Sequence, residues 1–306
     1  MLLVAMGPLL ISPPADSAIA ANIAKQCGGD IGELTLREFP DGELYVRIDT
    51  PLKGRNVWVI CTMLPAGKKM HAAFMLGATA KDLGATHVAL AAPYLAYLRQ
   101  DSRFKPGEGI TSRYVGIWLS SVFDEVLTLD PHLHRYETLS EVYAVPAKAL
   151  PTAPRIASWV KKEIKNPVIV GPDMESAQWA KAVASVLDCP TIILEKVRFG
   201  DDNVQVSAPD SSDLSLLDGR TPVLVDDIIS TGSTMVEALQ LLKKAKANEP
   251  HCVGIHAVFA GEGNSVESRL IKAGAKRVVT CNTIPHPTNA IDIVPTLSDE
   301  IKRVRG

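Results

Sequence analysis

The stretch VLVDDIISTGST, residues 223–234, combines two adjacent carboxylates with small hydroxylated residues around one glycine. Carboxylates accept hydrogen bonds from vicinal hydroxyls, as on a ribose, or hold a hydrated divalent cation, but they repel a phosphate. A phosphate is bound instead by hydroxyl donors and by the free N–H groups where a helix begins. The stretch therefore favours a sugar phosphate. The candidate residues are Asp226, Asp227, Ser230, Thr231, Gly232, Ser233 and Thr234.

The same stretch admits a simpler interpretation, in which an acid and a hydroxyl residue only cap a helix after a buried strand. One acid would be enough for such a cap, so the pair of acids favours a ligand. The P-loop pattern GxxxxGK[ST] occurs nowhere in the chain, which argues against that other type of phosphate site.

A strand followed by a helix must position these residues. PVLV, 222–225, predicts a buried strand that ends at the two acids. Beyond the loop ISTGST, Met235, Ala238, Leu239 and Leu242 have the i, i+3, i+4, i+7 spacing of a helix with one apolar face. Ligands of open α/β sheets bind outside the carboxyl ends of the strands, where this loop is predicted to lie.

Short apolar, β-branched runs recur along the chain and alternate with helix-like stretches. This alternation predicts an α/β fold with parallel strands and helices on both faces of the sheet. FPDGELYVRI departs from the pattern, because DG between the extended runs Leu34–Glu38 and Leu44–Ile48 predicts a projecting hairpin. The predicted strands are NVWVIC (56–61), HVALAA (87–92), EVLTL (125–129), PVIV (167–170), TIIL (191–194), PVLV (222–225), CVGIHAVFA (252–260) and RVVTC (277–281).

Proline residues suggest where the chain divides. Three prolines, Pro146, Pro151 and Pro154, precede a predicted helix and the strand at Val168. We therefore expect a domain boundary near residue 148, with domains 1–148 and 149–306 that each have their own series of strands and helices.

Composition excludes several classes of partner. The chain has 306 residues, 46% hydrophobic and 22% charged, and its 32 basic and 34 acidic side chains give a formal charge of -2. Such a balance offers no general footprint for nucleic acid or for an anionic membrane surface. No apolar run approaches the roughly 20 residues that span a bilayer, so we expect a small-molecule ligand and no membrane partner.

The cysteines and the first residues bear on location. Five cysteines lie far apart without a CxxC pair, which favours buried thiols in a reducing cytoplasm over a zinc site or disulfides. The opening MLLVAMGPLLISPPADSAIA lacks the basic segment of a secretion signal. It predicts a buried strand, a turn at Pro13–Pro14 and a helix, and we expect a cytoplasmic protein.

VLVDDIISTGST resembles the phosphoribosyl pyrophosphate motif shared by type I phosphoribosyltransferases and ribose-phosphate pyrophosphokinases. Further stretches resemble the pyrophosphokinases alone, in the order of that family, so the resemblance spans almost the whole chain. It implies two phosphoribosyltransferase-like domains, each a mainly parallel sheet flanked by helices, of which only the second keeps the sugar-phosphate loop. The stretches are FPDGE (39–43), PYLAYLRQDSRFKPGEGIT (93–111), VLTLDPHLH (126–134), VGPD (170–173), LEKVRF (194–199) and TIP (283–285).

The resemblance implies a ribose-phosphate diphosphokinase that transfers the diphosphoryl group of ATP to the 1-hydroxyl of ribose 5-phosphate with Mg²⁺. Asp226 and Asp227 would hold the ribose hydroxyls, the cation shell or both, and residues 230–234 the 5-phosphate. Lys196 and Arg198 would form a cationic clamp on a mobile flap and stabilise the transferring phosphate.

The remaining roles implied by the resemblance concern ATP and the metal. His132 would contact Mg²⁺ or the ATP phosphates, and Asp173 would be a second metal residue; from the residues alone, LDPHLH is equally a solvated turn. The loop residues Arg99, Gln100 and Asp101 would hold ATP. The hairpin residues Phe39, Asp41 and Glu43 would reach the ATP pocket of a neighbouring chain, which implies a homo-oligomer.

Two alternatives remain open at this point. The chain could be a type I phosphoribosyltransferase, although the first half and RQDSRF do not suit one. It could also be a non-catalytic regulatory homologue of the synthetase. Against this, His132, Lys196, Arg198 and the sugar-phosphate loop are all present.

Overall fold

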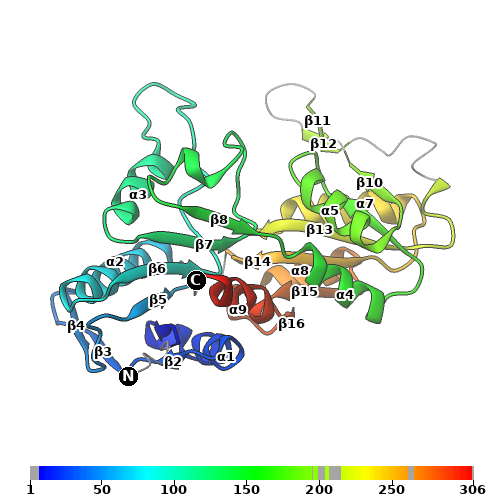
Figure 1. The fold of residues 1–306 in the computed structure, drawn as a ribbon. Coiled ribbons are helices and arrows are strands. Elements are labelled where there is room, and N and C mark those ends of the chain that lie inside the picture. The colour runs from blue at the N-terminus through cyan, green and yellow to red at the C-terminus, as the bar shows by residue number, and fades with distance from the viewer. Residues whose placement is uncertain (1–6, 195, 199–203, 207–214, 261–264, 305–306) are drawn as a thin grey trace. The chain divides into compact units, whose positions relative to one another are not determined.

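The computed structural model describes residues 7–194, 196–198, 204–206, 215–260 and 265–304. The chain forms two compact units (Figure 1). The first comprises Met1–Leu150 together with Val294–Gly306, and the second Pro151–Ile293. The α/β class predicted from the alternation of strands and helices is confirmed.

A six-stranded parallel sheet forms the centre of the first unit, in the order β2-β1-β5-β6-β7-β8 (Figure 1). The side chains of β1, β5 and β6 are almost wholly buried, as expected for parallel strands covered on both faces. The strands are β1 (Leu9–Ile11), β2 (Asp30–Ile31), β5 (Asn56–Ile60), β6 (His87–Ala92), β7 (Glu125–Leu129) and β8 (Ala147–Leu150); the helices are α1 (Ser17–Cys27), α2 (Ala66–Asp82) and α3 (Thr111–Ser120), with short 3-10 turns at Pro14–Asp16 and Leu139–Glu141.

The predicted hairpin is confirmed, with the bounds expected from the sequence. β3 (Leu34–Glu38) and β4 (Leu44–Ile48) pair antiparallel and form a separate ribbon. The turn depends on Gly42, whose φ of 91° is a left-handed conformation that glycine adopts without a steric penalty. An ion pair of 2.7 Å between Lys68 of α2 and Glu38 fixes the ribbon against that helix.

The last helix, α9 (Val294–Arg303), belongs to the first unit, whereas the sequence placed it with the second half. Its apolar face contacts α1, and the Ser298 hydroxyl donates to the carbonyl of Ile23 at 3.4 Å. Lys148, at the end of the sheet, pairs with the buried Glu300 carboxylate at 2.6 Å. The chain therefore returns to its first unit because α9 buries apolar side chains there.

The second unit has its own six-stranded parallel sheet, in the order β10-β9-β13-β14-β15-β16 (Figure 1). A short antiparallel pair, β11 (Lys196–Arg198) and β12 (Val204–Val206), lies outside that sheet. The sheet strands are β9 (Pro167–Gly171), β10 (Thr191–Ile193), β13 (Thr221–Ile229), β14 (His251–Ala257), β15 (Arg277–Cys281) and β16 (Asn289–Ile291); the helices are α4 (Ala153–Glu163), α5 (Ala177–Leu187), α7 (Ser233–Lys244) and α8 (Ser265–Ala273).

The apolar face predicted for the helix after the sugar-phosphate motif is confirmed. Met235, Ala238, Leu239 and Leu242 of α7 are all buried, in one cluster with side chains of β9, β13, β14 and α8. This cluster holds the start of α7 rigidly against the end of β13. None of the helices in the described ranges has the length and apolar character of a membrane-spanning segment.

The contribution of α9 to the first unit can be measured. Leu297 is fully buried. Leu297→Ala should lower the free energy of unfolding by about 2–4 kcal/mol, because a cavity remains under the helix. Hydrogen exchange followed by mass spectrometry should show faster exchange in α1 but not in α7. The exposed Lys302→Ala on the same helix is the matched control, and equal protection of α1 in both variants would contradict the packing role.

Candidate active site

The two acids of the sugar-phosphate motif lie on β13 rather than after it. The sequence predicted that the strand ends at Asp226 and Asp227, but β13 continues to Ile229. The reason is that β14 extends equally far, so that Ile228 pairs with His256 and Ile229 with Ala257. The carboxylates are consequently placed by a regular strand instead of a loop, which fixes their backbone positions.

Asp226 lies among other carboxylates. Burial raises the pKa of Asp226 well above the ordinary value, and the charges of Asp227 and Asp173 raise it further. The backbone N–H of Asp227 donates to the Asp226 carboxylate at 3.0 Å, and that of Ile228 donates to Asp227 at 2.7 Å. The dominant charges that the structure describes around Asp226 are negative, which is the environment that a divalent cation or hydroxyl donors would relieve.

The loop between β13 and α7 presents hydroxyls at the start of a helix. Gly232 is the N-cap with a φ of 76°, and α7 has no side-chain cap. A Cβ on Gly232 would approach a Val266 methyl carbon to 3.0 Å, so glycine is required by sterics as well as by conformation. Thr231 and Ser233 are exposed and their hydroxyls lie 3.1 Å apart. A helix start whose N-cap residue has no side chain, with hydroxyls beside it, is suited to an anion.

Arg269 supports this loop and was not anticipated from the sequence. Its guanidinium donates to the carbonyl of Thr231 at 2.9 Å, from α8, which lies 38 positions further along the chain. No local spacing links the two residues, so only the packing of α8 beside α7 reveals the contact.

Asp173 follows the carboxyl end of β9, as expected from the sequence, and its loop is tightly bonded. The Ser176 hydroxyl donates to the Asp173 carbonyl at 2.6 Å, and the Ser176 N–H donates to the Asp173 carboxylate at 3.1 Å. Gly171 lets this turn approach the sheet, since a Cβ there would lie 2.9 Å from the Ser176 hydroxyl. Ser176 thus orients Asp173.

Lys196 and Arg198 lie on β11, whose backbone pairs antiparallel with β12. Lys196 is opposite Val206, and Arg198 is opposite Val204. Their side chains, and the neighbouring residue 195, lie outside the described residues. The backbone of the predicted clamp is therefore a two-stranded ribbon, and the orientation of its cations stays a prediction.

In the first unit, the predicted ATP loop and the His132 loop follow the neighbouring strands β6 and β7. His132 is half-buried, and its ring lies 4.9 Å from that of His134 in an edge-on contact. Arg99 is exposed, Gln100 is half-buried and Asp101 is buried. Because the carboxyl ends of adjacent parallel strands lie at one edge of a sheet, the two loops lie side by side.

Asp101 joins the two loops. One of its carboxylate oxygens accepts from the Arg135 guanidinium at 2.9 Å, while the other is buried and has no hydrogen-bond partner among the described residues. The Tyr136 hydroxyl lies 3.3 Å from the Asp101 carbonyl and 3.1 Å from the Ser112 hydroxyl. Arg135 also lies over the Phe104 ring, at 4.9 Å. Sequence reasoning missed Arg135 and Tyr136, because only the fold brings 101 and 135 together.

The hairpin tip is exposed in this chain. Phe39 is 38% exposed; its ring lies edge-on to that of Tyr45, and the Arg37 guanidinium lies 4.6 Å from the centre of the Phe39 ring. The Asp41 carboxylate accepts from the N–H of Glu43 at 3.1 Å, so part of its hydrogen bonding is used inside the turn. The ribbon lies beside α2, away from the carboxyl ends of β6 and β7 (Figure 1).

Metal binding was predicted through His132 and Asp173. Among the described residues, no group of three or more His, Cys, Asp and Glu side chains is arranged to hold an ion. Magnesium is commonly held by one or two carboxylates together with water and phosphate oxygens. The carboxylates around Asp226 match that donor chemistry, so the residues present fit a hydrated Mg²⁺.

The crowding of carboxylates around Asp226 predicts an unusual effect on stability. Folding raises the pKa of this carboxyl, so its contribution to stability is fully present below about pH 4, where the group is protonated in both states. The contribution is lost as the pH rises through the pKa of the folded state. Asp226→Asn keeps the acceptor for the Asp227 N–H and removes the repulsion. The variant should therefore gain on the order of 1 kcal/mol at pH 7 and little at pH 4.

Thermal unfolding of the ligand-free protein between pH 4 and pH 8 measures this effect. Asp218→Asn, an exposed position just before β13, is the matched control and should change little. A loss of stability at pH 7 on changing Asp226 would contradict the assignment of a repulsive cluster.

Comparisons with known proteins agree with both units. The family model described as "N-terminal domain of ribose phosphate pyrophosphokinase" matches residues 9–122, and that described as "Phosphoribosyl transferase domain" matches residues 145–295. The fold is similar to that of phosphoribosylpyrophosphate synthetase from Mycobacterium smegmatis, with a TM-score of 0.84, 23% identity and coverage of 97% of this chain and 98% of the other.

Curated relatives match the chain from end to end. It is 33% identical over 298 residues to the ribose-phosphate pyrophosphokinase of Methanothermobacter thermautotrophicus, covering 96% of this chain and 100% of that protein. It is 35% identical over 281 residues to the ribose-phosphate pyrophosphokinase of Pyrococcus furiosus, covering 90% and 96%. On this evidence the chain belongs to the ribose-phosphate pyrophosphokinase family.

Proposed function

We propose that the chain transfers the diphosphoryl group of ATP to the 1-hydroxyl of ribose 5-phosphate, giving phosphoribosyl pyrophosphate and AMP. The observation that carries the proposal is the Asp226–Asp227 pair at the end of β13, which leads within a few residues into a helix start without a side-chain cap. Membership of the pyrophosphokinase family supports it, and the chain is accordingly a transferase.

The second unit would bind ribose 5-phosphate. The 5-phosphate would accept hydrogen bonds from the hydroxyls and N–H groups of residues 230–234, where the positive end of α7 favours an anion. The carboxylates of Asp226 and Asp227 would accept from the ribose hydroxyls. With the phosphate and the diol both held, the 1-hydroxyl would be fixed for attack, which is the main requirement of such transfers.

Mg²⁺ would bind near the carboxylates of Asp173 and Asp226, with His132 contacting the ion or the ATP phosphates. When bound, the ion would neutralise charge on the phosphates during transfer. Ser176 would keep Asp173 oriented through its two hydrogen bonds. A cation would also lower the raised pKa of Asp226 and keep that carboxylate ionised as an acceptor.

Lys196 and Arg198 would supply the positive charge that the transferring phosphate needs. In the described part of the chain, β11 and β12 form a two-stranded ribbon separate from the six-stranded sheet, an arrangement suited to closing over a bound substrate. Lys196 would stabilise the transition state more than the bound substrates, so its loss should reduce turnover rather than binding.

ATP would be held by Arg99 and Gln100, with the buried Asp101 fixing their loop through Arg135. Phe39, Asp41 and Glu43 would contact the ATP of a neighbouring chain, because the hairpin lies apart from the ATP loop of its own unit. This makes the chain a homo-oligomer of at least two copies, related by a symmetry that repeats the same contact. The boundary near residue 148 would then separate an ATP-binding domain from a ribose 5-phosphate domain.

The alternatives are distinguished by products. A type I phosphoribosyltransferase would consume phosphoribosyl pyrophosphate, and a regulatory homologue would make none. The match of the first unit to the pyrophosphokinase N-terminal domain favours synthesis. All five cysteines are free in the structure, in keeping with the predicted cytoplasmic location, which stays a prediction.

The reaction itself is the first test. Purified protein with Mg²⁺, ATP and ribose 5-phosphate should form AMP and phosphoribosyl pyrophosphate in equal amounts. Phosphorus NMR measures both products. Omission of ribose 5-phosphate is the control for simple ATP hydrolysis. ADP as the nucleotide product would overturn the proposal, because it would mean transfer of a single phosphoryl group.

The second test concerns Lys196. Lys196→Ala should lower kcat by about 100-fold to 1000-fold, the usual effect of removing one contact to charge that develops in the transition state. The KM for ribose 5-phosphate should change much less. Lys181→Ala, an exposed lysine on α5, is the control for the loss of a positive charge. A wild-type kcat for Lys196→Ala would remove the residue from the catalytic set.

The third test asks whether the hairpin serves a neighbour. A Phe39→Ala, Glu43→Ala chain and a Lys196→Ala chain should each be nearly inactive. A random mixture of dimers reassembled from both should recover about a quarter of the wild-type sites, because half of the pairs are mixed and each mixed pair rebuilds one site.

Co-expression of the two mutants with different tags allows the mixed species to be purified and assayed. In the control, each mutant is co-expressed with itself in both tagged forms and purified in the same way. Activity of the mixed species no higher than that of its parents would show that the hairpin does not reach a partner's site.

A further inference from the structure

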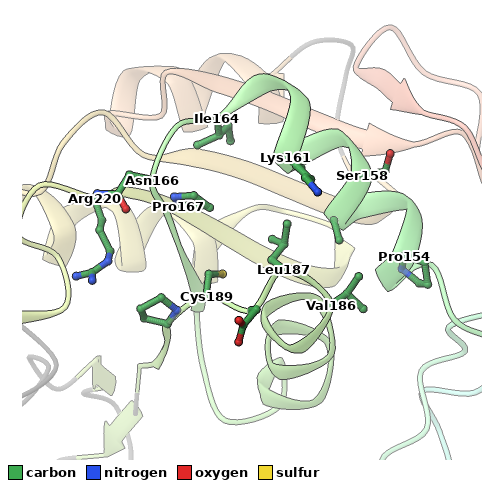
Figure 2. Close-up of a pocket in the computed structure, with 13 residues that line it drawn as sticks. Pro154, Ser158, Lys161, Ile164, Asn166, Pro167, Val186, Leu187, Cys189 and Arg220 are labelled. Carbon is green, nitrogen blue, oxygen red and sulfur yellow. The ribbon is translucent and has the colours of Figure 1, made fainter.

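A pocket of about 600 Å³ lies in the second unit, where the chain enters the strands of the sheet (Figure 2). It is bounded by α4, by the end of α5 and by the residues that lead into β9, β10 and β13. Asp226 lies six residues beyond Arg220, which corresponds to roughly 20 Å of extended strand. The pocket is therefore separate from the site that would bind ribose 5-phosphate.

Apolar side chains form the body of the pocket. Ala157 of α4 and Val186 and Leu187 of α5 line it together with prolines. Figure 2 shows Val186 and Leu187 on the side of α5 and Pro154 on that of α4. Val186 is 55% exposed although it is a β-branched aliphatic residue. The volume is within the range of about 300–1000 Å³ typical of sites for small organic molecules.

Two cations line this apolar space. Among the described residues, the Lys161 ammonium makes no ion pair with an acid, whereas that of its neighbour Lys162 lies 3.7 Å from the Glu163 carboxylate. The Arg220 guanidinium donates to the carbonyl of Leu216 at 3.1 Å, which orients it while its other N–H groups remain available. Asp188 is the single acidic residue of the lining. The described lining therefore has a net positive charge.

The rim beside Arg220 is fixed by short-range bonds. The Asn166 side-chain amide donates to the carbonyl of Gly219 at 2.7 Å, and the N–H of Thr221 donates to the carbonyl of Asn166 at 3.0 Å. These bonds tie the segment before β9 to the segment before β13. The position of Arg220 is consequently set by the fold before any ligand binds, which lowers the entropic cost of binding.

We propose that this pocket is a second ligand site, which takes a small organic anion with a flat apolar body. Arg220 and Lys161 supply the positive charge that attracts the anionic group, and Ala157, Val186 and Leu187 contact the body. Neither ribose 5-phosphate nor a polyphosphate has an apolar surface that matches most of this lining. The site is therefore distinct from that of the proposed reaction, and binding to it can be measured without turnover.

Cys189 supplies a reporter for occupancy, because it lines the pocket and is half-buried while the other four cysteines are buried. Burial raises the pKa of the Cys189 thiol, so it stays neutral and reacts slowly near pH 7. A neutral reagent such as N-ethylmaleimide should modify Cys189 in preference to the others, and a bound ligand should block it.

The probe is 1-anilinonaphthalene-8-sulfonate, with the uncharged N-phenyl-1-naphthylamine as its matched control. Saturating sulfonate should slow the modification of Cys189 about tenfold, as measured by peptide mass spectrometry. The uncharged compound at the same concentration should protect Cys189 far less. Ribose 5-phosphate should leave the protection unchanged. No protection by the sulfonate, or loss of protection with ribose 5-phosphate, would overturn the proposal, whatever the result of the activity assay.

Variants test the charge requirement. Lys161→Gln and Arg220→Gln should each raise the Kd of the sulfonate about 5-fold to 10-fold, the effect of one charge-assisted contact at a partly exposed site. Lys162→Gln on the same helix is the matched control and should leave the Kd unchanged. Because Lys161 is exposed, its variant is expected to fold normally, and thermal unfolding checks this. Equal Kd values for the Lys161 and Lys162 variants, or equal binding of the uncharged ring, would contradict an anion site.

Discussion

Burial of one carboxylate among others is the constraint on which the candidate site of the second unit depends. Asp226 and Asp227 are successive residues of a paired strand, so their separation is set by the backbone, and Asp173 adds a further negative charge from the end of β9. Such an arrangement lowers the stability of the ligand-free protein. Groups with strongly shifted pKa values at a strand end are typical of sites that bind or react with a ligand.

The surrounding structure holds these charges in place. β13 pairs with β9 along its first part and with β14 to its end, so neither acid can move without breaking parallel pairing. The buried side chains of α7 then fix the helix start a short distance beyond the acids. Gly232 suits this passage, because its φ of 76° is left-handed and a Cβ there would lie 3.0 Å from a Val266 methyl carbon. Binding of both ends of a sugar phosphate thus depends on one rigid strand-to-helix connection.

Much of this could be predicted from the sequence, because it is encoded by local patterns. The hairpin bounds, the buried face of α7 and the positions of most sheet strands follow from one DG turn, a period of 3.6 residues and short apolar runs. The short strands β2, β8 and β16 were not predicted. The end of β13 was predicted too early, at the two acids, because polar residues at 226 and 227 look like the end of a buried strand; β13 runs two residues beyond Asp227. The length of the partner strand β14 decides the point instead, and no local pattern reports it.

Contacts between distant segments could not be predicted. Three contacts join parts of the chain that no periodic spacing relates: that of Arg269 with the carbonyl of Thr231, that of Arg135 with Asp101, and that of α9 with α1. The role of an acid also depends on such contacts. A motif identifies an aspartate as a candidate, but the charges that the fold places around it decide what it does.

Asp101 and Asp226 illustrate this difference. Both are acids at the end of a parallel strand or in the loop that follows it, and the resemblance assigns both to substrate binding. Asp101 is buried with Arg135 as its counterion, so its charge is offset by the protein and its main effect is to fix a loop. Around Asp226 the dominant described charges are those of other acids. An ionised Asp226 therefore requires a cation, or hydrogen-bond donors in addition to the Asp227 N–H. A hydrated metal ion together with the hydroxyls of a sugar would supply both.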